Sequence, residues 1–338
     1  MTKIAILGAG SWGTALATVV AENGHTVALW THKPAQAEFI NTNHLNPDYL
    51  GDNPINPGVV ATADMLDAVT GAEIVVSVVP TKATREVAAK LADVLKELGD
   101  QKIILVGATK GLEPVTFKRV SEMLAEEVPE QYRSGVAVIE GPSHAEGVVK
   151  HDPTLVTAVS ENLAVAEAVQ DVFTNTHFRV YTGSDMIGAE VGAALKNVIA
   201  IGAGALDGLG YDSNAKAALF TRGLAEITRL GQAFGANPLT FMGLSGVGDL
   251  FVTATSVHSR NFRAGQQLGT GKTLPEIVEN MGMVIEGIST AKVAYELSQA
   301  KHVTMPITES IYKVLYEDLD IQVAIQDLMS RPVKQEGK

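Results

Sequence analysis

Six residues near the N-terminus, Gly8-Ala9-Gly10-Ser11-Trp12-Gly13, have the spacing G-x-G-x-x-G. They follow an apolar run at residues 4–8 and open a helical pattern at residues 12–23. That context is typical of a turn that binds the pyrophosphate of a dinucleotide. Gly8 permits the tight turn, Gly10 lets the backbone approach the phosphates, and Gly13 lets the helix pack closely on the strand. Free N–H groups and the helix dipole then favour the anion, although a glycine-rich turn without a ligand is the alternative.

The end of the second predicted strand, at residues 26–31, selects the cofactor of such a turn. A site for NAD usually carries an acidic residue there, whose carboxylate binds the ribose hydroxyls. This chain has Thr31-His32-Lys33-Pro34 instead, with no acidic residue. A basic pair suits a 2′-phosphate, so we expect NADP(H) as the preferred cofactor and NAD(H) as the alternative. If His32 and Lys33 are only solvated loop residues, this preference has no basis.

A lysine within an otherwise apolar helix is the main candidate for catalysis. Lys196 lies in the segment 188–204, where nearly every other residue is small or apolar, so the helix should be buried. Burying an ammonium group is unfavourable unless the group is paired. Desolvation also lowers the pKa of a lysine toward the range used in acid–base chemistry. Lys196 is therefore a candidate acid–base group, and a lysine that reaches solvent from the helix edge is the alternative.

Two polar segments follow predicted strands of the first half of the chain. Lys110 lies just past the strand predicted at residues 103–106, and the turn 140–145 follows the strand predicted at residues 136–139. In a doubly wound sheet, ligands bind beyond the carboxyl ends of the strands, so both segments should face one crevice. His144, within that turn, has no partner in sequence that would make it a base or a metal ligand, and we interpret it as pocket lining.

Two further segments of the second half combine charge with a constrained backbone. The glycine density of residues 243–250 implies a tight conformation that directs Asp249. Arg260 lies between Ser259 and Asn261, and its guanidinium could clamp phosphate oxygens in a bidentate manner. A cationic helix start without a ligand is the alternative. In a chain of net charge −12, a phosphorylated substrate would depend on such local basic groups.

Hydrophobic patterning divides the chain into two parts. Apolar runs of strand length alternate with helical stretches such as 82–98 up to about residue 184; the runs are 4–8, 26–31, 74–79, 103–106 and 136–139, with shorter ones at 155–159 and 178–181. Their near-continuous Val and Ile content predicts a parallel sheet covered by helices on both faces. Beyond that point the pattern is helical only, at 186–206, 215–234, 289–300 and 307–316. We predict an α/β fold, with an N-terminal Rossmann-type doubly wound sheet in residues 1–184 and an all-α C-terminal domain in residues 185–338.

Composition excludes several classes of protein. The 338 residues contain 26 Lys and Arg against 38 Asp and Glu, which argues against a nucleic-acid binder or docking on anionic lipid. No apolar run approaches the ~18 residues that span a bilayer. Lys3 followed by residues 4–21 resembles a signal peptide in pattern, but that stretch contains the glycine turn, so we do not expect it to be cleaved.

The chain has no Cys, and its eight His lack metal-ligand spacing, so we expect no metal site and a reducing, cytoplasmic setting. The polar tail at 330–338 should fray.

Eight segments, in order along the chain, resemble the bacterial NAD(P)-dependent glycerol-3-phosphate dehydrogenases. They are residues 8–17 (GAGSWGTALA), 108–113 (ATKGLE), 141–143 (GPS), 195–201 (LKNVIAI), 246–250 (GVGDL), 259–261 (SRN), 284–287 (VIEG) and 305–307 (MPI). Any one of them could arise by chance, whereas all eight in order are highly specific.

The resemblance implies a cytoplasmic homodimer that reduces dihydroxyacetone phosphate to sn-glycerol 3-phosphate, the backbone precursor of phospholipid synthesis. It implies that Lys196 is the catalytic acid–base group. The residues implied to contact the substrate are Lys110, Gly141, Ser143, Lys196, Asp249, Ser259, Arg260 and Asn261. Those implied to contact the cofactor, besides Gly8, Gly10 and Gly13, are Ser11, Trp12, His32, Lys33, Lys110, Ala145, Arg260, Val284 and Glu286.

The chain departs from the usual family pattern at two positions. His144 stands where members often carry Phe, and Phe262 stands where many carry Arg. The second departure removes one positive charge beside the phosphate clamp, although Arg263 remains. The affinity of this chain for a phosphorylated substrate is therefore the property most affected.

Two other functions stay open at the level of the sequence. A related two-domain reductase of a hydroxy acid or of 6-phosphogluconate would also combine a dinucleotide-binding sheet with a helical domain and a buried lysine. The run 259–261 and the Gly-Pro-Ser turn favour the triose phosphate over these substrates. A non-catalytic NADP sensor would need the glycine turn, but it has no use for a buried Lys196 beside Asp249 and Arg260.

Overall fold

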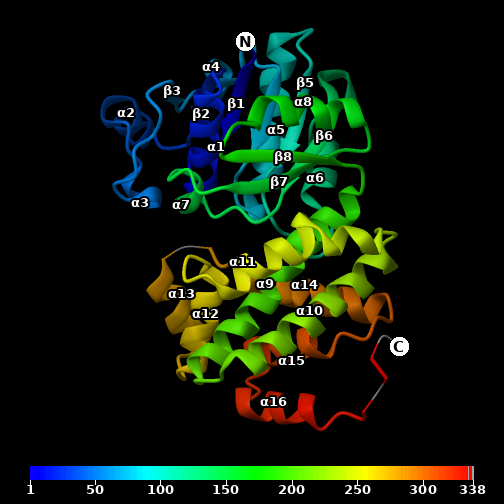
Figure 1. Ribbon diagram of the computed structural model, residues 1–338. Helices are drawn as coiled ribbons and strands as arrows, with labels where there is room; N and C mark the ends of the chain where they lie inside the picture. Colours follow the sequence, from blue (N-terminus) through cyan, green and yellow to red (C-terminus); the bar gives the residue numbers. More distant parts are fainter. Residues whose placement is uncertain (283, 334, 337–338) are drawn as a thin grey trace.

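The chain folds into a sheet region followed by a helical region. The computed structural model describes residues 1–282, 284–333 and 335–336. Figure 1 shows the strands and their helices, in blue to green, stacked above a bundle of helices, in green to red. The last strand ends at Gly183 and the first long helix of the bundle begins at Met186. This arrangement confirms the predicted fold class.

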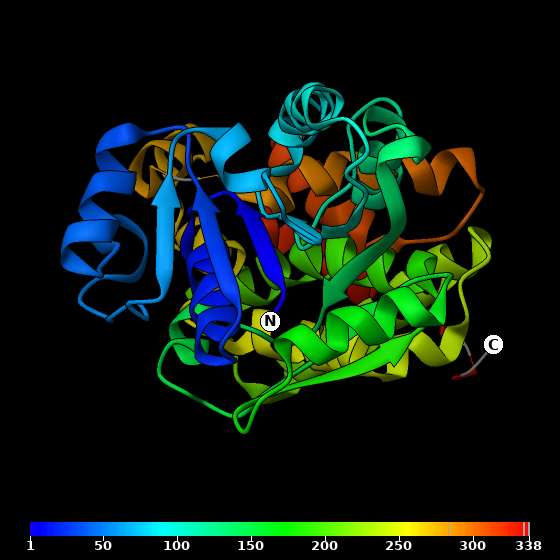
Figure 2. The same ribbon diagram turned by 90° about the horizontal axis from the view of Figure 1, so that it is seen from above.

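The sheet has eight strands in the order β3-β2-β1-β4-β5-β6-β7-β8. Their bounds are β1 Lys3–Leu7, β2 Thr26–Trp30, β3 Val59–Thr62, β4 Ile74–Ser77, β5 Ile103–Gly107, β6 Arg133–Glu140, β7 Thr154–Val159 and β8 Phe178–Gly183. In the view of Figure 2 the blue strands lie on one side and the green ones on the other. The order reverses between β1 and β4, since β2 and β3 lie on one side of β1 and the later strands on the other. Ligands of doubly wound sheets bind at this reversal, beyond the carboxyl ends of the strands.

Helices cover both faces of this sheet. They are α1 Ser11–Glu22, α2 Pro34–Asn43, α3 Pro47–Leu50, α4 Met65–Val69, α5 Thr84–Leu98, α6 Val120–Glu127, α7 Ala145–Val148 and α8 Leu163–Phe173, with 3₁₀ turns η1 Thr81–Ala83 and η2 Glu130–Tyr132. Successive side chains of a strand point to opposite faces. In β1, Ile4 and Ile6 belong to one buried cluster and Ala5 and Leu7 to another. Burial on both faces explains why the strand lacks polar alternation.

The helical region is built around α9, Met186–Gly208. The other elements are α10 Ser213–Ala233, η3 Pro238–Met242, η4 Leu244–Gly248, α11 Asp249–Thr255, α12 Arg260–Gly269, α13 Leu274–Met281, α14 Glu286–Ala300, α15 Pro306–Tyr316 and α16 Ile321–Met329. By length and composition α9 could cross a membrane, with a mean hydropathy of 1.4 over 18 residues, but 89% of that window is buried inside the fold. Its apolar surface is therefore covered by the neighbouring helices.

Several sequence-based expectations need correction. The sheet is not wholly parallel, because β7 pairs antiparallel with β6. The connection at 141–153 holds only the four-residue α7 and has no helix long enough to cross the sheet. The strand β3 was not predicted, since it has only four residues and its apolar run is no longer than Val59, Val60 and Ala61. The helix predicted at 82–98 begins at Thr84, after η1. The prediction for the tail lies partly outside the described residues, at 334, 337 and 338.

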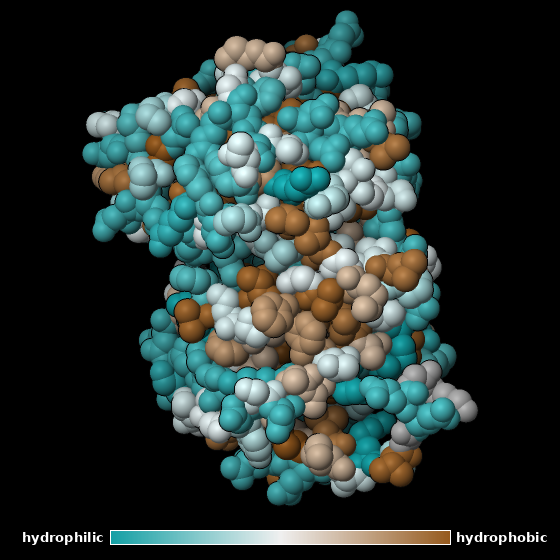
Figure 3. Space-filling model, in the orientation of Figure 1, coloured by the Kyte–Doolittle hydropathy of each residue, from teal (hydrophilic) through white to brown (hydrophobic). Residues whose placement is uncertain are grey.

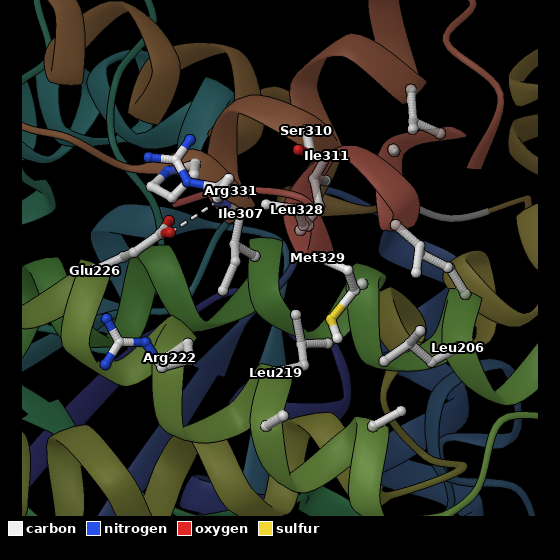
Figure 4. Close-up of a pocket in the computed structure, with 18 of the residues that line it drawn as sticks. Leu206, Leu219, Arg222, Glu226, Ile307, Ser310, Ile311, Leu328, Met329 and Arg331 are labelled. Carbon is white, nitrogen blue, oxygen red and sulfur yellow. Dashed lines mark hydrogen bonds between the residues drawn. The ribbon is translucent and has the colours of Figure 1, made fainter. Parts of the chain in front are cut away.

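A cavity of about 720 Å³ lies between α9, α10, α15 and α16. Figure 4 shows apolar side chains such as Leu219 and Leu328 facing it, with Arg222 and Glu226 toward one end. The Glu226 carboxylate accepts hydrogen bonds from the backbone N–H groups of Ile307 and Thr308, so it caps the start of α15. None of the predicted site residues lines this cavity. The predicted chemistry therefore gathers elsewhere.

Candidate active site

The glycine turn joins β1 to α1 with little room for side chains. Gly8 has a φ of +122°, and a Cβ there would lie 2.9 Å from the carbonyl oxygen of Val78. A Cβ on Gly13 would overlap the carbonyl oxygen of Gly8, so α1 packs against the turn only with glycine there. A Cβ on Gly10 would meet no atom closer than 4.0 Å, at Tyr49. The turn is therefore closed toward the sheet and open above Gly10, where a phosphate group fits.

The first turn of α1 is suited to an anion. Its N-cap, Gly10, offers no side-chain acceptor, so the leading N–H groups are free to bind a ligand. The Ser11 hydroxyl donates to the carbonyl of Tyr49 over 2.9 Å. The Trp12 indole N–H is buried and finds no partner among the described residues. A pocket of about 590 Å³ begins at these residues, and they fit the pyrophosphate of a dinucleotide.

The predicted selectivity residues lie just beyond β2. Both His32 and Lys33 are exposed, and His32 lines the pocket. Lys33 instead occupies the N-cap position of α2 and does not line the pocket. No acidic side chain follows Trp30 directly, as the sequence indicates. His32 is therefore better placed than Lys33 to meet the ribose end of a bound dinucleotide.

Farther along the same pocket, three charged side chains form a chain of hydrogen bonds. Lys196, on α9, is only 5% exposed, and its Nζ donates to Oδ1 of Asp249 and to Oγ1 of Thr253, the latter over 2.7 Å. The other oxygen of Asp249, Oδ2, accepts from Nζ of Lys110 over 2.7 Å. One carboxylate thus bridges two ammonium groups. Because Lys196 is buried and paired, the alternative of a lysine that reaches solvent from the helix edge is wrong.

The backbone around Asp249 explains how the carboxylate reaches α9. The element η4, a single π turn over Leu244–Gly248, directly precedes Asp249 at the start of α11. Such turns occur frequently at functional sites, because they redirect the residues that follow. A Cβ on Gly192 would lie 2.7 Å from the carbonyl oxygen of Ser245, so α9 accepts the π turn at this distance only with glycine. The glycine-rich segment therefore places Asp249 against the face of α9 that carries Lys196.

The site shifts the pKa values of its two lysines in opposite directions. Burial lowers the pKa of Lys196 to about 8, with the charge of Lys110 acting in the same direction and Asp249 opposing it. Burial would also lower the pKa of Lys110, but attraction by Asp249 and by Glu140 raises it above its ordinary value. Lys110 thus keeps its charge through the neutral range. Lys196 can lose its proton near physiological pH, as a general acid must.

Lys110 also fixes the turn that follows β6. Its Nζ donates to the carbonyl of Gly141 over 3.0 Å, and the Ser143 hydroxyl donates to the same carbonyl over 3.0 Å. Ser143, His144 and Ala145 line the pocket, whereas Gly141 lies behind them. The half-buried His144 lies 3.3 Å from the carbonyl of Val252, and burial lowers its pKa, so it is uncharged at neutral pH. It lines the pocket, as we predicted.

The start of α12 and the start of α14 close the pocket on another side. The Ser259 side chain caps α12, and Nη1 of the exposed Arg260 donates to the carbonyl of Val284 over 2.9 Å. Asn261 is buried, and its Nδ2 donates to Oδ1 of Asn197 over 2.9 Å. Burial raises the pKa of Glu286, whose carboxylate accepts from the N–H of Thr81. These side chains hold the helix starts in place around the guanidinium of Arg260.

Phe262 and Arg263 show how the departure at position 262 affects the positive charge of the pocket. Phe262 is 5% exposed and belongs to the apolar cluster of the helical region, away from the pocket lining. Arg263 is exposed and lines the pocket. A second guanidinium is therefore available beside Arg260 even though position 262 carries no charge.

The structure brings most of the predicted site residues to this one pocket. Its lining includes Gly8, Gly10, Ser11, Trp12, His32, Lys110, Ser143, Ala145, Lys196, Asp249, Ser259, Arg260, Asn261, Val284 and Glu286. It does not include Gly13, Lys33 or Gly141, which lie next to lining residues. Segments more than 250 residues apart along the chain thus surround a single cavity. The role of each residue stays a prediction.

Among the residues of the site that were not predicted, three lie beside Lys196 or Lys110. Thr253, which accepts from Lys196, lies one helical turn after Asp249 and so shares its helix face. Asn197, next to Lys196, lines the pocket. Glu140 is a buried carboxyl at the last position of β6. In the sequence it could have been noticed as a charged residue directly after the apolar run 136–139 and before the Gly-Pro-Ser turn.

A cluster of possible metal ligands lies at the C-terminal end of α1, the end away from the glycine turn. Nε2 of His151 and Nε2 of His177 lie 2.9 Å and 3.1 Å from the two carboxylate oxygens of Glu22. The potential ligand atoms of these residues all lie within 4.8 Å of one another. The residues are far apart in sequence, so spacing alone could not reveal the cluster. They do not line the pocket described above.

Comparison with known families matches both regions of the chain. Residues 3–166 match the model of the NAD-dependent glycerol-3-phosphate dehydrogenase N-terminus, and residues 185–326 match that of the C-terminus. A protein of Limosilactobacillus fermentum called glycerol-3-phosphate dehydrogenase [NAD(P)+] is 59% identical over 99% of both chains. A protein of the same name from Leuconostoc mesenteroides is 60% identical over 99% of this chain and all of its own length.

A solved structure agrees with these relatives. The crystal structure of glycerol-3-phosphate dehydrogenase from Coxiella burnetii superposes with a TM-score of 0.90 at 38% identity, covering 98% of this chain and 99% of the other. The matches span both the sheet region and the helical region, and they confirm the resemblance found in the sequence. The chain belongs to the NAD-dependent glycerol-3-phosphate dehydrogenase family.

Proposed function

We propose that the chain catalyses the reversible reduction of dihydroxyacetone phosphate to sn-glycerol 3-phosphate, with NADP(H) preferred over NAD(H). The observation that carries the proposal is the buried Lys196–Asp249–Lys110 chain in the pocket that begins at the glycine turn. The names of relatives about 60% identical over the whole chain support the same reaction. The product would supply the glycerol phosphate backbone for phospholipid synthesis.

Lys196 has the properties of a general acid for a ketone. A nicotinamide cofactor bound at the glycine turn supplies the hydride. As negative charge develops on the C2 oxygen of the substrate, the ammonium of Lys196 stabilises it and donates the proton. Asp249 and Thr253 hold that ammonium in one orientation. Lys110 stays charged beside them and adds to the positive potential of the site.

Arg260 is expected to anchor the phosphate of the substrate. We predict that Arg260→Ala raises KM for dihydroxyacetone phosphate about tenfold or more, because a guanidinium–phosphate pair is lost. The loss also misaligns the carbonyl, so kcat falls as well. Initial rates over a range of substrate concentrations measure both constants. Arg179→Ala, on the exposed surface of β8, is the matched control and should leave KM unchanged. An unchanged KM in Arg260→Ala would remove Arg260 from the phosphate site.

His32 is expected to contribute to cofactor preference. We predict that His32→Asp lowers the ratio of kcat/KM for NADPH to that for NADH by about tenfold, because a carboxylate repels a 2′-phosphate and accepts hydrogen bonds from ribose hydroxyls. Lys33→Ala, whose side chain lies outside the pocket, should have the smaller effect. Initial rates with both cofactors give the ratio. A ratio that does not change in His32→Asp would assign the preference to another residue.

The two alternative functions predict different uses of the pocket from the proposed reaction. A reductase of a hydroxy acid or of 6-phosphogluconate is not favoured by the three relatives named above, whose names specify glycerol-3-phosphate. A non-catalytic sensor has no need for the paired lysines. The decisive experiment is the loss of NADPH absorbance when dihydroxyacetone phosphate is added to the purified protein. A panel containing 6-phosphogluconate and short hydroxy acids, tested with NADP, serves as the comparison. Turnover of one of those compounds alone would refute the proposed substrate.

We also propose that the protein is a cytoplasmic homodimer whose subunits join residues 1–184 for the cofactor with residues 185–338 for the substrate. Figure 3 shows apolar side chains gathered on one face of the helical region. Large apolar side chains exposed in this region include Leu239 (73%), Met242 (66%) and Phe251 (61%). Contiguous exposed apolar surface typically marks a protein interface. Cell fractionation would test the location.

The exposed apolar side chains give a direct test of the dimer. We predict that the wild-type protein elutes with the mass of two chains, and that Met242→Asp shifts it toward the mass of one, because a charge in an apolar interface is desolvated without a partner. Light scattering after size exclusion measures the mass. Val60→Asp, at an exposed position of β3, is the control for a charge placed on another surface. A wild-type protein with the mass of one chain would contradict the dimer.

A further inference from the structure

Glu140 is a buried carboxyl group within the charged cluster to which no role has yet been given. It is the last residue of β6 and is 1% exposed. Its Oε2 lies 3.6 Å from Nζ of Lys110, beyond hydrogen-bond distance. That oxygen finds no hydrogen-bond partner among the residues that the structure describes. An ionised carboxylate in such a place lacks the donors that normally stabilise it.

The charges around Glu140 come from three segments. Lys110 follows β5, Asp249 begins α11, and Lys196 and Glu190 lie on α9. Glu190 accepts hydrogen bonds from Arg119 and Ser121, so its charge is compensated locally. The groups left to balance one another are therefore Glu140, Lys110, Asp249 and Lys196.

With both lysines charged, these four groups can exist in two charge states near neutral pH. With Glu140 protonated, two ammoniums face the single carboxylate of Asp249, and the cluster carries one net positive charge. With Glu140 ionised, two ammoniums face two carboxylates, and the cluster is neutral. Burial raises the pKa of Glu140 to about 8 against the attraction of Lys110, so both states lie within reach of the pH at which Lys196 titrates. The geometry couples the protonation of Glu140 to that of Lys196 through Lys110 and Asp249.

We propose that Glu140 is a positioning residue for the reaction: its buried carboxyl beside Lys110 can release a proton, and the carboxylate that results helps Lys196 to keep its own proton. The inference rests on the proposed function of Lys196 as the general acid. As the pH rises, Glu140 and Lys196 lose protons over the same range, and loss from Glu140 leaves a carboxylate beside Lys110. The carboxylate that results stabilises both ammoniums, so Lys196 stays competent to a higher pH than burial beside Lys110 alone would allow.

The variant Glu140→Gln tests this role because it keeps the shape of the side chain and removes its proton exchange. We expect kcat for ketone reduction below pH 6.5 to stay within about twofold of the wild type. At that pH the side chain at position 140 is uncharged in both the wild type and the variant. The alkaline limb of the kcat profile should move to lower pH by about one unit, because Lys196 loses its compensating carboxylate. Glu140→Asp keeps a titrating carboxyl and should restore part of that shift. Glu73→Gln, at an exposed position before β4, is the matched control and should leave the limb in place.

A second measurement does not depend on turnover. Infrared difference spectra of the wild-type protein across the pH range detect a protonated buried carboxyl by its C=O stretching band. We expect such absorption at neutral pH, a decrease as the pH rises past about 8, and a smaller decrease in Glu140→Gln, because burial also raises the pKa values of Glu190, Glu226 and Glu286. If dihydroxyacetone phosphate is not turned over but the band is present, the proposed function fails and the protonation of Glu140 stands. A decrease of the band that is the same in Glu140→Gln as in the wild type, or an unmoved alkaline limb in Glu140→Gln, overturns the inference.

Discussion

Replacing Lys196 with methionine is expected to lower kcat for the reduction of dihydroxyacetone phosphate by about a thousandfold. Methionine keeps the apolar stem of the side chain and removes the group that would protonate and stabilise the developing alkoxide. NADPH should still bind with an affinity within about twofold of the wild type, because the glycine turn is built from other elements. Steady-state rates and fluorescence titration with NADPH measure the two quantities.

The proposed role of Lys196 also predicts how kcat of the wild type changes with pH. Burial lowers the pKa of Lys196 to about 8, so the ammonium predominates below that pH and the free amine above it. Reduction of the ketone needs the ammonium, so kcat should fall as the pH rises through about 8. Oxidation of sn-glycerol 3-phosphate needs the amine as base, so its rate should rise over the same range. Opposite slopes for the two directions identify one group acting in both.

The control for Lys196→Met is Lys292→Met, which changes a lysine on the exposed surface of α14. It should leave kcat and NADPH binding unchanged, and thermal unfolding of both variants should show that the fold is intact. If Lys196→Met retains more than about a tenth of the wild-type kcat, the general acid is another group.

Replacing Asp249 with asparagine is expected to have the second-largest effect. The amide is nearly the same size, but it leaves the ammoniums of Lys110 and Lys196 without the carboxylate that bridges them. We predict a fall in kcat of about a hundredfold and a loss of about 3 kcal/mol in the free energy of unfolding, because two buried like charges lose their counter-charge. Initial rates and urea unfolding measure the two effects.

The change at Asp249 should also alter the pH profile. Asp249 is the strongest opposing influence on the lowered pKa of Lys196, so its loss moves the alkaline limb of ketone reduction to lower pH. Asp171→Asn, an exposed change near the end of α8, is the matched control for both stability and activity. A variant Asp249→Asn with normal kcat and an unmoved limb would show that Lys196 does not depend on this carboxylate.

The fold was largely predictable from local patterns. The apolar strands are buried on both faces, so their sequences carry no polar alternation, and this marked the sheet. The edge strand β3 was missed because it has only four residues, of which three are apolar. The antiparallel pairing of β7 escaped because the direction of a strand depends on the connection before it, and hydrophobic content does not encode that direction.

The residues of the glycine turn and Lys196 were predictable individually. Gly8 and Gly13 are required by backbone geometry within a few residues, so the requirement is written locally in the sequence. Lys196 was conspicuous because a charge within an apolar helix is costly unless it is used. Glu140 was overlooked because an acidic residue at the end of a strand is common where a loop begins, so its position did not indicate burial.

The types of residue and their order along the chain determined the fold class, the dinucleotide turn and the membership of the family, because each depends on short-range spacing or on similarity along the chain. Only the tertiary structure decided that hydrogen bonds link Lys196, Asp249 and Lys110, and that one oxygen of Glu140 has no hydrogen-bond partner among the described residues. The pKa of each group depends on burial and on charges from segments far away in the sequence. That information arises only when the sheet and the helical region pack together.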